Sequence, residues 1–239
     1  GSQMTQKPKS ADIHLGPGFR IREKIERLST DIIEQFRLFE SPDISDLLNR
    51  MYAMSSEIHN VVNSASIAGS ACTVKVYPGD NLMIHKALGV AEPGDIVVVD
   101  CCGSFTNAVV GDLLAQKAKS LGIAGFVIDG MVRDLPAMQE VGLPVYARGV
   151  TPVGPLHRGP GEVNHSISCG GIVVNPGDVI LGDVTGVVVI RREFAEDVLR
   201  RAYVQRDATR TYVDSVRRGI FSLDWVDAIL AAAGYEEEE

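Results

Sequence analysis

The spacing of apolar residues changes near residue 66. Before that point, "IREKIERLSTDIIEQFRLFE" (residues 21–40) places apolar side chains at helical spacing, which predicts a helix. The following "SPDISDLLNRMYA" has Ser41 in the N-cap position and Pro42 at the first helical position, which marks the start of a second helix. Residues 21–64 are therefore expected to form a helical N-terminal arm.

From residue 66 onward the pattern consists of short β-rich runs bounded by turn residues. These runs are "CTVKVYP", "DIVVVDC", "GFVIDG", "VYARGV", "GIVVNPGD", "DVILGD" and "GVVVI". Between them, "GDLLAQKAKSLGI" (residues 111–123) returns to helical spacing. Strands around a helix predict an α/β core over residues 65–190.

The pattern ends in a second helical arm, residues 191–232. Residues 192–217 predict one long helix, and "RGIFSLDWVDAILAAAG" predicts a turn followed by a short helix. We interpret residues 21–232 as a single domain with two helical arms. Residues 233–239 are expected to form an acidic solvated tail, and residues 1–20 a flexible segment that starts with the cloning-remnant-like "GSQM".

The composition is that of an ordinary globular protein and argues against some partners. Hydrophobic residues make up 45% and charged residues 23% of the 239 residues, and the formal net charge is −8. This charge argues against nucleic-acid and anionic-membrane partners. With neither a membrane-length apolar run nor a secretory signal, a cytoplasmic protein is expected. Reduced thiols are favoured over a metal site for the four cysteines, Cys72, Cys101, Cys102 and Cys169.

Two short stretches carry the candidate chemistry. In "TNAVVGDLLAQ", Gly111 precedes a predicted helix start at Asp112, where unpaired amides can bind a carboxylate or a phosphate; the alternative is that Asp112 only caps the helix. In "FVIDGMVRD", Arg133 offers a planar fork for a carboxylate and Asp134 a hard oxygen ligand, unless the two form a structural ion pair. A strand end and a helix start often face one crevice, so the stretches together suit a small acid bound with a divalent cation.

The spacing of these residues resembles that of a known family. Asp112, twenty intervening residues and the Arg133-Asp134 pair, with "GDLLA" at the start, are similar to the RraA-like proteins and the class II 4-hydroxy-4-methyl-2-oxoglutarate / 4-carboxy-4-hydroxy-2-oxoadipate aldolases. The resemblance covers about residues 20–232 and includes "PGDNLMIHKAL", "PGDIVVVD", "ARGVTPVGP", "GPGEVN", "CGGIVVNPGD" and "RGIFSLDWVDAIL". It implies a swivelling β/β/α fold and a homotrimer or homohexamer with active sites between subunits.

The resemblance also implies a role for each matching position. Arg133 would bind the pyruvate part of the substrate and steady the developing enolate, and Asp134 would anchor Mg²⁺ or Mn²⁺. Asp112 would hold a water bound to that metal. The pyruvate carboxylate would lie in the cradle at the helix start, formed by Gly111, Leu113, Leu114 and Ala115.

One position departs from the aldolases. They use a glutamate from the C-terminal helix of a neighbouring subunit for proton transfer, whereas this chain has "VQRDATRTYV" there, and Asp207 is the nearest carboxylate. The implied function is cleavage of a branched 4-hydroxy-2-oxo di- or tricarboxylic acid, as in aromatic catabolism, to pyruvate and an oxo acid, with oxaloacetate decarboxylation as a side activity. The alternatives are a dedicated oxaloacetate decarboxylase and a non-catalytic RraA-type regulator of ribonuclease activity. The helical arms favour the aldolase.

Other polar residues are weaker candidates. His85 and Lys86 could bind a second carboxylate of the substrate, although an exposed helix face also explains them. His157 and Arg158 lie in a loop rich in Pro and Gly. Lys75 lies in a strand pattern and would be the lysine of a Schiff-base aldolase, which is the less favoured mechanism.

Overall fold

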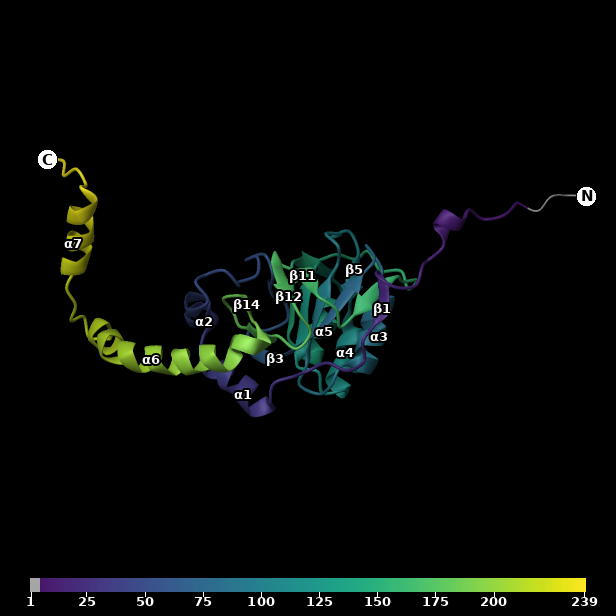
Figure 1. Cartoon of the computed structure of the whole chain (residues 1–239), viewed down its shortest axis with the longest axis horizontal. Helices are drawn as coiled ribbons and strands as arrows, with labels where there is room; N and C mark the ends of the chain where they lie inside the picture. Colours follow the sequence, from purple (N-terminus) through teal and green to yellow (C-terminus); the bar gives the residue numbers. More distant parts are fainter. Residues whose placement is uncertain (1–4) are drawn as a thin grey trace, which may run out of the picture. The chain divides into compact units, whose positions relative to one another are not determined.

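The centre of the computed structural model, which describes residues 5–239, is a mixed β-sheet (Figure 1). Its strands lie in the spatial order β1 (Phe19–Ile21), β10 (Gly161–Val163), β3 (Ile67–Val76), β4 (Ile96–Asp100), β6 (Gly125–Asp129), β8 (Val145–Ala147) and β2 (His59–Asn60). Strands β3, β4, β6 and β8 are mutually parallel, whereas β10 runs antiparallel to β3. The parallel block directs its carboxyl ends toward one edge of the sheet.

Further strands extend or accompany this sheet. An antiparallel pair, β13 (Val179–Gly182) and β14 (Val187–Ile190), continues from β3 through β13. A hairpin consists of β11 (Ile167–Cys169) and β12 (Ile172–Val174). A small parallel sheet consists of β5 (Ala108–Val110), β7 (Met131–Val132) and β9 (Gly149–Val150).

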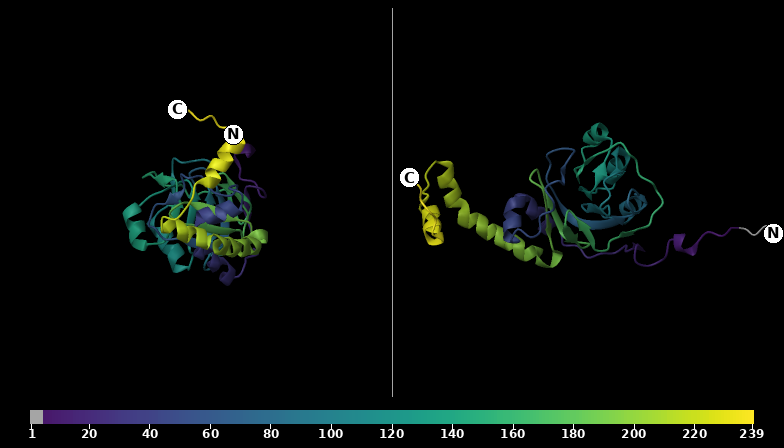
Figure 2. Two further views of the ribbon diagram at one scale, coloured as in Figure 1. Left: turned by 90° about the vertical axis from the view of Figure 1, so that its left-hand side faces the viewer. Right: turned by 90° about the horizontal axis from the view of Figure 1, so that it is seen from above.

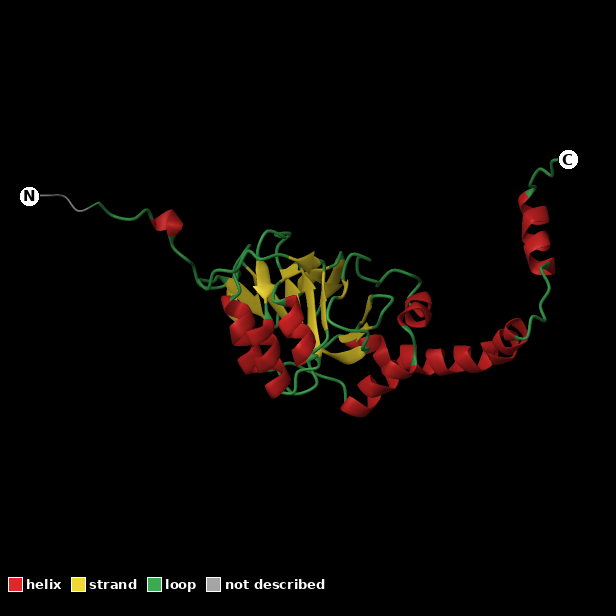
Figure 3. Cartoon of the chain, turned by 180° about the vertical axis from the view of Figure 1, so that it is seen from behind, coloured by secondary structure: helices red, strands yellow, loops and turns green. Residues whose placement is uncertain are grey.

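Three helices cover one face of the central sheet, as Figure 3 shows. They are α3 (Leu82–Val90), α4 (Asp112–Ser120) and α5 (Leu135–Val141). The other helical elements are η1 (Lys9–Ala11), α1 (Thr30–Gln35), η2 (Phe36–Leu38), α2 (Ser41–Leu47), η3 (Arg192–Phe194), α6 (Ala195–Arg217) and α7 (Asp224–Ala233).

The central strands bury both faces, and alternate residues divide between two cores. In β4, Val97 and Val99 pack with α3 and α4, whereas Ile96 and Val98 pack with β11, β13 and β14. The sheet is therefore the middle layer between helices and a second set of strands. This confirms the predicted α/β class and the β/β/α arrangement.

The prediction of one helix over residues 21–40 is wrong in its first half. Strand β1 pairs with β10, and α1 begins only at Thr30. Between them, the Arg27 guanidinium donates two hydrogen bonds to the buried Asp95 carboxylate, at 2.9 and 2.8 Å. This distant charged partner outweighs the local helical periodicity because Asp95 would otherwise be buried without its cation.

The second predicted helix is present with a shifted cap. It begins at Ser41 with Pro42 in its first turn, but Glu40 occupies the N-cap position. Ser41 instead donates two hydrogen bonds to the Asp183 carboxylate, both 2.7 Å long, from its amide and its hydroxyl. The helix ends at Leu47 and is shorter than the pattern indicated.

The predicted strand runs, the helix at residues 111–123 and the two C-terminal helices are all present. By internal packing the chain forms two compact units, one ending at Leu199 and one from Arg200 to Glu239; α6 begins in the first and continues in the second (Figure 2). None of the described helices is long and apolar enough to cross a membrane. The interpretation of residues 21–232 as a single domain stays a prediction. The "GSQM" of the predicted flexible segment at residues 1–20 lies outside the described residues.

Candidate active site

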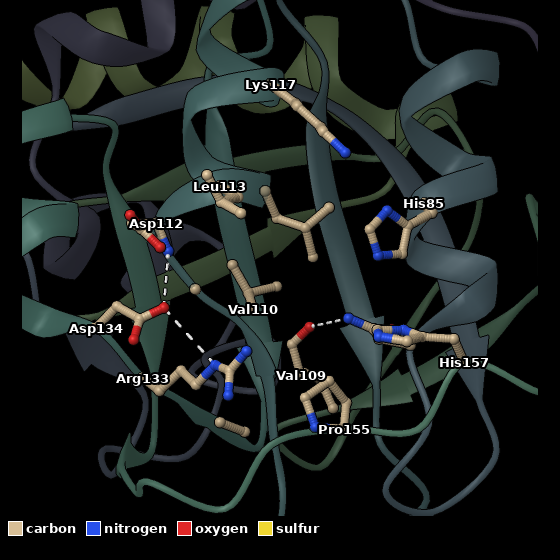
Figure 4. Close-up of a pocket in the computed structure, with 14 residues that line it drawn as sticks. His85, Val109, Val110, Asp112, Leu113, Lys117, Arg133, Asp134, Pro155 and His157 are labelled. Atoms are coloured by element: carbon tan, nitrogen blue, oxygen red, sulfur yellow. Dashed lines mark hydrogen bonds and ion pairs between the residues drawn. The ribbon is translucent and has the colours of Figure 1, made fainter.

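The two predicted stretches meet in one pocket with a volume of about 420 Å³ (Figure 4). One wall is formed by the end of β5, the start of α4 and the connection between β7 and α5. The opposite wall is formed by α3 and the loop at residues 151–160, and α4 extends between the walls. Figure 4 shows Asp112, Arg133 and Asp134 together on the first wall and His85 and His157 on the second.

Gly111 allows two elements of the first wall to approach each other closely. Its φ of −136° and ψ of −164° are ordinary extended values. A Cβ on Gly111 would lie 2.4 Å from Asp134 Oδ2 and 3.3 Å from Arg133 Cγ. The absence of a side chain therefore lets the Arg133-Asp134 pair lie directly against the start of α4.

Asp134 has the backbone geometry of a constrained position. It lies just before α5 with φ +58° and ψ +41°, a left-handed conformation that non-glycine residues rarely adopt. Its carboxylate does not cap α5. Instead Oδ2 accepts a 3.4 Å hydrogen bond from the Asp112 amide and lies 3.6 Å from Arg133 Nε. The last distance is a loose ion pair, so Arg133 keeps donors for a ligand.

The start of α4 supplies a smaller set of amides than predicted. Gly111, and not Asp112, occupies the N-cap position, so the cap interpretation of Asp112 does not describe the structure. The Ala115 amide donates to Gly111 O at 3.1 Å and is used within the helix. Among the described residues, the amides of Leu113 and Leu114 have no hydrogen-bond acceptor. These two amides remain for an anion at the positive end of the helix.

The second wall contains two histidines that contact each other. The His85 and His157 rings lie edge to face with centroids 5.6 Å apart. His157 Nδ1 lies 2.5 Å from Oδ1 of the buried Asn81, whose Nδ2 donates to Val109 O at 2.9 Å. Burial lowers the pKa of His85, and the nearby Lys117 and His157 lower it further. Of the two α3 candidates, His85 lines the pocket, whereas Lys86 is exposed and does not line it.

Sequence reasoning missed Asn81 and Lys117. Lys117 follows Leu113 by four residues, a spacing that places it on the helix face of the predicted carboxylate cradle. That spacing could have identified Lys117. Asn81 had no comparable signal, because its role depends on how the chain before α3 meets the loop that carries His157.

Three other candidates do not line this pocket. Asp207 lies on α6, exposed, with its carboxylate 3.2 Å from Arg210. Lys75 is the second-last residue of β3, with its ammonium 3.8 Å from Asp100. Its side chain is 44% exposed, which does not suit a desolvated Schiff-base lysine. The Arg158 amide donates to Asp80 at 2.6 Å.

The first wall fits a hard divalent cation that keeps most of its water. Within residues 5–239, no group of three or more His, Cys, Asp or Glu is arranged to hold a metal ion. Asp134 nevertheless presents a carboxylate that caps no helix and is 39% exposed, and Asp112 lies beside it. Mg²⁺ commonly takes one or two carboxylates and completes its shell with water and substrate oxygens.

Comparisons with known proteins show which family the chain is similar to. The RraA-like family model, described as Aldolase/RraA, matches residues 41–189. The chain is 42% identical over 172 residues to "Putative 4-hydroxy-4-methyl-2-oxoglutarate aldolase" of Halalkalibacterium halodurans, covering 72% of this chain and 82% of that protein. It is similar to RraAS2 of Streptomyces coelicolor, a member of the RNase ES inhibitor RraA family, with TM-score 0.71 and 25% identity, covering 79% of this chain and 98% of that one. The chain is also similar to the RNA-processing inhibitor RraA from Thermus thermophilis, with TM-score 0.59 and 31% identity, covering 64% of this chain and 92% of that one.

Proposed function

Because this chain belongs to the Aldolase/RraA family, we propose that it is a divalent-metal-dependent lyase that releases pyruvate from a 4-hydroxy-2-oxo acid. The substrate would be a di- or tricarboxylic acid such as 4-hydroxy-4-methyl-2-oxoglutarate or 4-carboxy-4-hydroxy-2-oxoadipate. The observation that carries the proposal is the meeting of Arg133, Asp134 and the start of α4 in one pocket.

The 2-oxo acid end of the substrate would bind at the first wall. Its carboxylate would accept hydrogen bonds from the Leu113 and Leu114 amides, where the helix dipole favours negative charge. Arg133 would donate to the carboxylate and to the C2 oxygen through its planar fork. A Cβ on Gly154 would lie 2.7 Å from Arg133 Nη1, so the loop backbone confines the guanidinium.

Aldol cleavage breaks the C3–C4 bond and moves its electrons to C3 and the C2 oxygen. Arg133 would stabilise the negative charge that develops on that oxygen. Asp134, with Asp112 beside it, would hold a largely hydrated Mg²⁺ or Mn²⁺, which when bound supplies Lewis-acid polarisation of the 2-oxo acid. Protonation of C3 then yields pyruvate.

The C4 hydroxyl must lose a proton when the bond breaks. Asp207 on α6 is our candidate for this base, acting in a neighbouring copy of a homotrimer or homohexamer. The support is the position of Asp207 on the C-terminal helix that the family resemblance identifies. Oxaloacetate decarboxylation needs no such base and would be a side activity. If no carboxylate acts as this base, decarboxylation would be the main activity.

A second candidate function has specific support. RraAS2 is described as a member of the RNase ES inhibitor RraA family, and the Thermus thermophilis RraA is described as an RNA-processing inhibitor. Both are similar to this chain in fold and sequence. A protein of that kind would bind a ribonuclease complex without releasing pyruvate. We favour the enzyme because pyruvate release would use Arg133 and Asp134 in the pocket, whereas inhibition of a ribonuclease would not.

A pyruvate-release assay separates the two functions. Purified protein would be stripped with EDTA and supplied with 4-hydroxy-4-methyl-2-oxoglutarate, 4-carboxy-4-hydroxy-2-oxoadipate or oxaloacetate. We expect no release without metal and recovery with Mg²⁺ or Mn²⁺. Release from oxaloacetate alone would assign a decarboxylase, and trapping of a lysine adduct by borohydride with pyruvate would overturn the metal mechanism. No release from any of the three would favour the regulator.

A further inference from the structure

The wall opposite Arg133 has a different electrostatic character. Lys117 from α4, His85 from α3 and His157 from the 151–160 loop line that part of the pocket. The pocket's two carboxylates, Asp112 and Asp134, lie on the first wall. Three elements therefore bring cationic or protonatable groups to the side of the pocket away from the proposed metal position.

Lys117 has no anionic partner in the part of the chain that the structure describes. Its exposed ammonium lies more than 4.0 Å from every described carboxylate. Burial lowers the pKa of the His85 imidazole, and repulsion from Lys117 lowers it further. An anion between Lys117 and His85 would relieve this repulsion.

The hydrogen bonds of Asn81 fix how His157 can bind a ligand. Because Nδ2 of Asn81 donates to the Val109 carbonyl, its Oδ1 faces His157 and accepts the proton on Nδ1. Nε2 is then the nitrogen left for a ligand, and it donates to an anion when the ring is protonated. Asn81 is 2% exposed, so this orientation is held by a buried group.

From this juxtaposition we infer that Lys117, His85 and His157 form a subsite for the distal carboxylate of the substrate. The inference rests on the proposed function and deepens it: the enzyme would select 2-oxo acids with a second carboxylate over those with an apolar end. The volume of about 420 Å³ suits a small acid that spans both walls.

The test is the binding of two probes that differ only at the far end of the molecule. 2-Oxoglutarate and 2-oxopentanoate would be titrated calorimetrically into the full chain with Mg²⁺. We expect the wild type to prefer 2-oxoglutarate, and Lys117→Met to weaken 2-oxoglutarate about 10-fold while leaving 2-oxopentanoate unchanged. Lys117→Glu should weaken 2-oxoglutarate further. The matched control is Lys86→Met, which removes the same charge from the exposed side of α3.

Equal wild-type affinity for the two probes, binding of neither, or retained preference in Lys117→Met would overturn the subsite. Cleavage assays separate this failure from failure of the proposed function. If the enzyme cleaves 4-hydroxy-2-oxoglutarate and 4-hydroxy-2-oxopentanoate equally well, the aldolase stands and the subsite is wrong. If neither is cleaved while the binding preference disappears in Lys117→Met, the subsite stands and the proposed aldolase is wrong.

Discussion

Gly111 and Asp134 are so close that a methyl group on Gly111 would lie 2.4 Å from Asp134 Oδ2. Atoms at this distance overlap, so the carboxylate keeps its position only while residue 111 has no side chain. The start of α4 and the Arg133-Asp134 connection are therefore positioned against each other. A change at a residue with no functional group should alter the chemistry of the site.

We predict that Gly111→Ala lowers metal-dependent pyruvate release by about 10- to 100-fold, because displacing a positioned group by about 1 Å can cost this much. The fold should persist, since a shift of one exposed carboxylate relieves the overlap. The matched control is Gly89→Ala in α3, where an added Cβ has no neighbour within 4 Å. Steady-state kinetics and circular dichroism check both variants, and a fully active Gly111→Ala would contradict the prediction.

Arg133→Lys is expected to be nearly as damaging as Arg133→Ala. A lysine ammonium is a point charge and cannot donate to the carboxylate and the C2 oxygen at once, as the planar fork can. Losing such a donor typically lowers turnover by about 10²–10³. The values of kcat for both variants with saturating Mg²⁺ test this. If the lysine variant keeps most of its activity, Arg133 supplies only positive charge.

Asp207→Asn should separate the two reactions. Aldol cleavage needs a base for the C4 hydroxyl, so we expect it to fall by about 10²–10⁴. Oxaloacetate decarboxylation needs none and should change little. The ratio of the two rates at one metal concentration is the measurement, with Asp214→Asn on the exposed surface of the same helix as control. An unchanged ratio would remove Asp207 from the mechanism.

Glu162 should make stability depend on pH. Burial alone would raise the pKa of its carboxyl, but hydrogen bonds from the Arg20 side chain and the Gly18 amide outweigh burial and hold the pKa below its usual value. The stabilisation is present above the unfolded pKa of about 4.3 and is lost as pH falls through the folded value.

Glu162→Gln should therefore lower the free energy of unfolding by about 1 kcal/mol at neutral pH. The difference from wild type should shrink as the pH falls below the unfolded pKa. Urea unfolding at several pH values measures it. Glu26→Gln is the control, because Glu26 forms an ion pair with Arg192 while 80% exposed, and such pairs contribute little. If the difference in unfolding free energy between wild type and Glu162→Gln stays constant in acid, the lowered pKa of Glu162 does not stabilise the fold.

The local sequence pattern was sufficient to predict a strand or helix where its apolar positions are the ones that the fold buries. "IVVVD" predicted a strand because β-branched residues fill both faces, and all five of its residues are buried in β4. Residues 111–123 predicted α4 because Leu114 and Ala118 recur on one face, and both are buried. Residues 21–29 failed because Arg27 is held by Asp95, 68 positions away, and no local window contains that partner.

Some residues of the candidate site could likewise be predicted from the sequence, and others could not. Asp112, Arg133 and Asp134 could be predicted to converge because each lies at the end of a strand or the start of a helix. Asn81 is an ordinary polar residue in the sequence, and for Lys117 only the four-residue spacing from Leu113 indicated a position on the same helix face. Their place on the pocket wall comes from the packing of α3 and α4 on one face of the central sheet, which is a tertiary property.

The pairing of strand β3 also limits how early the central sheet can form during synthesis. On one side it pairs with β4, which follows within thirty residues, but on the other it pairs with β10 and β13, whose last residues are Val163 and Gly182. A nascent chain that has reached only residue 150 therefore carries β3 with one row of backbone donors and acceptors unmatched. More than a hundred residues must be synthesised after β3 begins before β10 and β13 can both pair with that edge. During this interval the unpaired edge is available to bind chaperones.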